Sequence, residues 1–77
     1  MTENRNFDRL AEETRRAVGL QISEARKAAG LSMRTLGTIV GIRHGKLSEL
    51  EQGRANVTID TLTRVCGSLG LKITLTQ

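Results

Sequence analysis

Glycine is the residue that divides this chain into segments, because its 77 residues contain no proline. Apolar residues recur at intervals of three or four along four stretches, which end near Gly30, Gly41, Gly53 and Gly70. This period is typical of amphipathic helices, and glycine often ends a helix because it adopts a left-handed backbone without strain. The sequence therefore predicts an all-α chain built from short helices.

The first stretch predicts a helix from about residue 8 to residue 29. The apolar residues that share one face of it are Phe7, Leu10, Ala11, Thr14, Val18, Ile22, Ala25 and Ala29. Thr14 can cap a second start and Gly19 is the weakest position, so both one helix and two remain open. Phe7 and Leu10 either extend the core or dock a partner.

The later stretches carry their own start signals. Ser32 and Thr58 are suited to N-caps, because a hydroxyl oxygen there accepts from an unpaired N–H of the first turn. The residues expected to face the core are Leu36, Ile39 and Val40, then Leu47 and Leu50, then Ile59, Leu62, Val65, Cys66 and Leu69. With Phe7 as the only aromatic residue, this core is aliphatic and small, a type often stabilised by dimerisation.

In the last residues the spacing of apolar side chains changes from three or four positions to two. Leu71, Ile73 and Leu75 alternate with polar residues, which is the pattern of a half-buried β-strand. A single strand leaves its backbone unpaired, and no other segment of the sequence has a strand pattern. We therefore expect this strand to pair with a second copy of the chain in a homodimer.

Composition limits the function classes. The single cysteine and single histidine exclude a disulfide framework and a clustered metal site, and no apolar run is long enough to span a membrane. No catalytic motif is present, so we expect neither an enzyme nor a cofactor. The polar start of the sequence lacks signal-peptide character, and the expected location is the cytoplasm, associated with the nucleoid. The net charge of +4 favours a polyanionic partner.

The densest basic cluster lies at the start of the third predicted helix, within GIRHGKLSELEQG. Arg43, His44 and Lys46 surround Gly45, a residue that weakens a helix by about 1 kcal/mol relative to alanine. An ordinary solvated face is one interpretation of this cluster. A catalytic or metal-binding role for His44 lacks the second ligand or base that it needs.

The surrounding residues decide between these interpretations. The sequence from Gly30 to Leu71 resembles the helix-turn-helix of Xre/Cro/C1-type repressors, in which the third helix enters the DNA major groove. The residues that carry the resemblance are Gly30-Leu31-Ser32, Leu36, Gly41-Ile42, Leu47-Ser48, Leu50-Glu51, Gly53, Asn56 with Thr58, Leu62 and Leu69-Gly70. It implies a lambda-repressor-like helix-turn-helix bundle of four to five helices, with an N-terminal extension at 1–17, the DNA-binding domain at 18–71 and a dimerisation strand at 72–77.

The resemblance also implies site residues. The expected base contacts are Arg43, His44, Gly45 and Ser48, and the expected phosphate contacts are Ser32, Met33, Arg34, Lys46, Arg54 and Asn56. The family often has glutamine where this chain has Met33, so Arg34 takes over the anchoring. Arg26 and Glu51 are expected to form a shielded ion pair between the first and third helices.

The short tail is most similar to that of HipB-like antitoxins. This similarity implies a homodimer that represses its own operon at an inverted-repeat DNA operator and also binds a HipA-like kinase toxin. Two alternatives remain: a module whose main role is toxin neutralisation, and a stand-alone Xre-family or phage-type regulator without a toxin.

Overall fold

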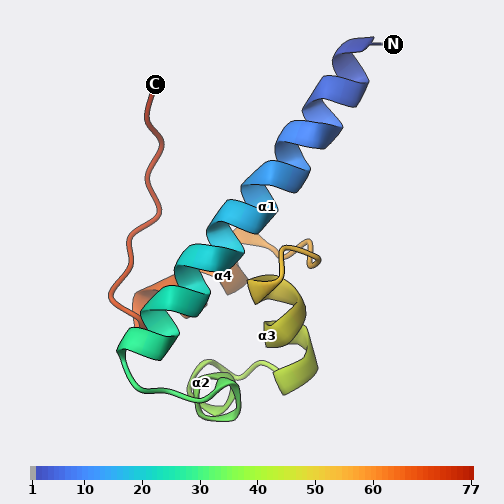
Figure 1. The fold of residues 1–77 in the computed structure, drawn as a ribbon. Coiled ribbons are helices and arrows are strands. Elements are labelled where there is room, and N and C mark those ends of the chain that lie inside the picture. The colour runs from blue at the N-terminus through green and yellow to red at the C-terminus, as the bar shows by residue number, and fades with distance from the viewer. Residues whose placement is uncertain (1) are drawn as a thin grey trace.

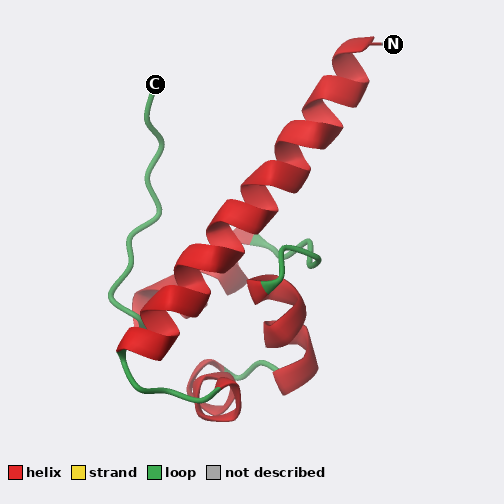
Figure 2. Ribbon diagram, in the orientation of Figure 1, coloured by secondary structure: helices red, strands yellow, loops and turns green. Residues whose placement is uncertain are grey.

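The computed structural model describes residues 2–77, and they form four α-helices. These are α1 (Thr2–Ala28), α2 (Met33–Val40), α3 (His44–Glu51) and α4 (Ile59–Ser68). The three short helices gather around the C-terminal half of α1, whose N-terminal half projects away from them (Figure 1). Helices and loops account for all described residues (Figure 2), and no described helix is long and apolar enough to cross a membrane.

Helix α1 is continuous, which settles the choice between one helix and two. It begins at Thr2, before the expected start near residue 8, and neither Thr14 nor Gly19 interrupts it. Gly19 has a packing role instead. A Cβ atom at Gly19 would lie 2.4 Å from the carbonyl oxygen of Leu50 and 2.6 Å from that of Glu51. The missing side chain therefore lets α1 touch the backbone at the end of α3.

The core lies between the C-terminal half of α1 and the three short helices. Its buried apolar residues are Ile22, Leu36, Val40, Leu47, Leu50, Ala55, Val65 and Cys66. Burial also raises the pKa of the Cys66 thiol. Two residues expected in this core are instead on the surface: Ile39 is 58% exposed and Ile59 is 67% exposed. Ile59 is the first residue of α4, where no preceding turn covers it.

The expected helix signals operate at both ends of α2. The Ser32 hydroxyl accepts a hydrogen bond from the Thr35 backbone N–H at 3.0 Å, and Gly41 ends the helix with a φ of 74°. Thr58 caps α4 in the same way through Thr61. The turn between α2 and α3 is thus fixed by a left-handed glycine, which positions the start of α3.

Both ends of the chain leave the core. Phe7 and Leu10 are 64% and 54% exposed on the projecting part of α1, so they do not extend the core of this chain. Leu71 packs against the core, whereas Leu75 is 98% exposed at the end of the tail. No strand forms among residues 2–77, because the tail runs past the helices without meeting another extended segment (Figure 1).

Candidate nucleic-acid interface

The first turn of α3 presents its donors to solvent. Arg43, His44, Gly45 and Lys46 are all exposed. Arg43 occupies the N-cap position, but its side chain makes no capping hydrogen bond. The first N–H groups of a helix have no partner within the helix, so this turn offers main-chain donors beside the cationic side chains.

The first turn of α4 differs in charge from the first turns of α2 and α3. A helix N-terminus favours negative charge, and Asp60 supplies it in the first turn of α4. The first turns of α2 and α3 contain no acidic residue. These two N-termini therefore keep their partial positive charge for an anion from outside the chain.

The turn between α2 and α3 brings Arg34 together with the start of α3. A shallow, open groove is lined by Arg34 and Thr38 of α2 and by Ile42, Arg43 and His44. Arg34 was expected to contact a phosphate and Arg43 to contact a base. Their position along one groove allows both kinds of contact to be made with the same stretch of a polyanion.

The packing of the described residues does not require a glycine at position 45, in the first turn of α3. A Cβ atom at Gly45 would meet nothing within 4 Å, unlike one at Gly19 or Gly37. Gly37 lies where a Cβ atom would be 2.6 Å from the Ile42 carbonyl oxygen, so it lets the turn close tightly. The packing of this chain thus explains Gly37 and leaves Gly45 unexplained.

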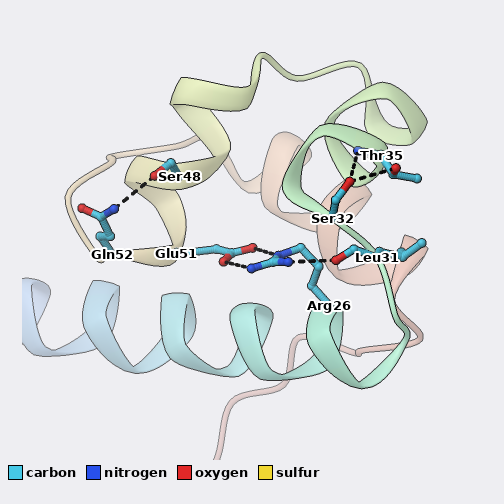
Figure 3. A network of polar contacts seen from close by, with 7 residues as sticks. All are labelled: Arg26, Leu31, Ser32, Thr35, Ser48, Glu51 and Gln52. Carbon is cyan, nitrogen blue, oxygen red and sulfur yellow. Dashed lines mark hydrogen bonds and ion pairs between the residues drawn. The ribbon is translucent and has the colours of Figure 1, made fainter.

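Ser48, in the second turn of α3, is hydrogen-bonded to Gln52, the C-cap of the helix. The Gln52 amide donates to the Ser48 hydroxyl at 3.0 Å (Figure 3), which leaves the Ser48 hydroxyl hydrogen available to an acceptor. Gln52 and Glu49 are exposed and were not among the expected site residues. Spacing could have found Gln52, since it lies four residues after Ser48 and shares its face of the helix.

An ion pair ties α3 to α1. The Arg26 Nε and Nη2 atoms donate to the two Glu51 carboxylate oxygens at 2.6 and 3.0 Å, and Nη1 donates to the Leu31 carbonyl oxygen at 2.8 Å (Figure 3). The hydrogen bonds with Glu51 raise the pKa of Arg26. Both residues are buried, so the expected shielded pair is present and fixes the end of α3 against α1.

This arrangement of α2, a tight turn and an α3 whose first turn is exposed agrees with the sequence comparison. A family model described as helix-turn-helix matches residues 22–75. The chain belongs to the helix-turn-helix family. No curated protein sequence matches it significantly.

Two solved structures share this helix-turn-helix fold, and both are of the clp gene regulator ClgR from Corynebacterium glutamicum. One is 37% identical with a TM-score of 0.71, over 74% of this chain and 61% of the solved chain. The other is 36% identical with a TM-score of 0.73, over 77% of this chain and 76% of the solved chain. The chain thus spans less than two thirds of the first of these proteins.

The remaining expected contact residues of the helix-turn-helix differ in how exposed their side chains are. Arg54 and Asn56 are exposed in the α3–α4 loop. The Met33 side chain is half-buried and packs against the core. The Ser32 hydroxyl donates to the Thr35 hydroxyl oxygen at 2.9 Å (Figure 3), so its own donor is used within the chain. No group of three metal-ligating residues occurs in the described part of the chain.

Proposed function

We propose that the chain is a sequence-specific, double-stranded DNA-binding transcriptional repressor that inserts the start of α3 into the major groove. The observation that carries this proposal is the first turn of α3, which has exposed cations, no acidic residue and a glycine that the packing does not require. The membership of the helix-turn-helix family and the similarity to a clp gene regulator support it.

The side chains of α3 divide into those that read bases and those that hold the backbone. Arg43 has the two-pronged geometry that matches guanine O6 and N7, and His44 and Ser48 hydrogen-bond base edges. Gly45 allows the helix backbone to approach the groove floor closely. The proposed phosphate contacts, some of them through main-chain N–H groups, are Ser32, Met33, Arg34, Lys46, Arg54 and Asn56.

A homodimer completes this function, because an inverted repeat is read by two α3 helices related by a two-fold axis. Their separation then matches one turn of DNA, about 34–36 Å, or a multiple of it. The tail supports the dimer through its alternation, since Ile73 and Leu75 leave apolar side chains exposed on a segment without a strand partner. A second copy supplies that partner.

A mobility-shift assay tests the regulator. The duplex upstream of the chain's own gene is compared with a random duplex of equal length, at low and moderate salt. We expect a clear preference for the upstream duplex and a steep loss of affinity with salt. Equal binding to both duplexes under all conditions would contradict sequence-specific repression at that site.

A second candidate is the antitoxin of a HipBA-like operon, with a HipA-like kinase toxin as partner. The observation that favours it is the exposed apolar pair Phe7 and Leu10 on the projecting half of α1, a surface that suits a protein partner. Co-expression with the product of the neighbouring gene tests this. A stable complex that Phe7→Ala with Leu10→Ala disrupts would support the antitoxin, and free chains would support a stand-alone regulator.

A further inference from the structure

A second basic surface lies on α1, before the residues 22–75 that match the helix-turn-helix family. Arg15 and Arg16 line an open groove of about 850 Å³ together with Arg54 and Asn56 of the α3–α4 loop. Glu12 is the one acidic residue among the described residues that line it. The groove is therefore cationic, and its other lining residues are polar or glycine.

Glycine at position 53 brings the two sides of this groove together. Gly53 has a φ of +75°, and a Cβ atom there would lie 2.7 Å from the Arg16 Cα and 2.8 Å from the Arg16 Cγ. The loop backbone thus touches α1 at Arg16. This contact brings the backbone of Arg16 close to the loop that carries Arg54, the residue after Gly53.

The arginines of this groove have no acidic partner. Among residues 6–77, the ion pair between Arg26 and Glu51 is the only one within 4.0 Å. No hydrogen bond of the Arg15, Arg16 or Arg54 side chain occurs in the same range. Three guanidinium groups therefore share one groove with their donors unsatisfied by the chain. Guanidinium suits phosphate, which it can bind with two parallel hydrogen bonds.

We propose that Arg15 and Arg16 extend the DNA interface by binding the sugar-phosphate backbone beside the bases that α3 reads. This inference rests on the proposed function, in which Arg54 and Asn56 already hold a phosphate. The α3–α4 loop lies between α3 and the projecting half of α1, along one side of the molecule (Figure 1). Phosphates repeat every ~3.4 Å along the axis of each strand, so a strand held at Arg54 presents further phosphates to α1.

The salt dependence of binding to a random-sequence duplex tests this site without knowledge of the operator. Arg15→Gln with Arg16→Gln is expected to make the negative slope of log affinity against log salt shallower by about 0.9 for each phosphate that the variant no longer binds. Arg15→Lys with Arg16→Lys keeps both charges and is expected to keep the slope. The matched control is Lys27→Gln with Arg64→Gln, which removes two exposed cations outside this groove.

The slope is measured on folded protein, as checked by circular dichroism. If the double glutamine variant does not fold, Arg15→Gln alone leaves Arg16 against Gly53 and is expected to bind one phosphate fewer. A slope as steep as that of the control variant overturns the α1 site. A shallower slope in a chain that does not prefer its upstream duplex would support the α1 site and contradict sequence-specific repression. An unmodified chain that binds neither duplex contradicts both.

Discussion

At the scale of single residues, two helical glycines give opposite predictions. Gly45→Ala is expected to stabilise the fold by about 0.5–1 kcal/mol, because a Cβ atom fits there and alanine favours the helix. The same methyl group projects from the exposed first turn of α3. We expect it to weaken DNA binding about tenfold, which corresponds to about 1.4 kcal/mol of steric cost. Chemical denaturation and mobility shifts measure the two effects, and unchanged DNA binding would remove the groove-facing role of Gly45.

Gly19→Ala is the matched substitution on α1, and we expect it to destabilise. Its Cβ atom would lie within 2.6 Å of two backbone carbonyl oxygens of α3, which cannot rotate away. Overpacking of this kind costs about 1–3 kcal/mol, which exceeds the gain in helix propensity. A lowered midpoint in chemical denaturation is the expected result. A Gly19→Ala chain as stable as the unmodified one would mean that α1 and α3 separate at no cost.

The Arg26–Glu51 pair gives the largest predicted effect on stability. Glu51→Gln leaves the buried guanidinium without its charged partner, and we expect a loss of about 3–5 kcal/mol. Replacement of both residues, as Arg26→Met with Glu51→Leu, removes the uncompensated charge and is expected to cost less than Glu51→Gln alone. Thermal unfolding compares the two chains, and a double replacement that costs more than Glu51→Gln would contradict the expected penalty for an uncompensated buried charge.

At the scale of helices, the sequence predicted what depends on local chemistry. Ser32, Thr58 and Gly41 mark helix ends because caps and left-handed turns are set by neighbouring residues. The packing role of Gly19 was not predicted, because it depends on the backbone of α3, which is distant in sequence, and no local pattern contains that contact. Ile59 was wrongly expected in the core, because the apolar period of a helix does not show that its first residue lies beyond the packed surface.

The proposed division of α3 side chains into base contacts and phosphate contacts predicts two distinct binding defects. If Arg43 contacts a base as proposed, Arg43→Ala is expected to cost about 1–3 kcal/mol on the preferred duplex while relaxing the choice of sequence. If Lys46 contacts a phosphate as proposed, Lys46→Ala is expected to weaken binding to all sequences alike, with a salt dependence shallower by about 1. Competition with random duplex separates the two. A uniform loss in Arg43→Ala would place that residue on the backbone instead.

At the scale of the whole molecule, the sequence could predict the bundle but not which surfaces its ends leave open. The Arg26–Glu51 pair was predicted because the family resemblance supplied it. The groove at Arg15 and Arg16 was not, since it exists only where Gly53 meets the projecting half of α1. An assembly is harder still to predict, because the same alternation in the tail is compatible with a loop in one chain and a strand between two.

The tail therefore carries the last prediction, which concerns the dimer. If a second copy pairs with it as a strand, one face is buried and the other is solvated. Ile73→Lys with Leu75→Lys should then reduce the solution mass towards that of one chain, 8.4 kDa. Thr74→Lys with Thr76→Lys adds the same charge to the opposite face and should leave the dimer intact. Light scattering after gel filtration measures both, and a dimer that also survives deletion of residues 72–77 must be held by the helices.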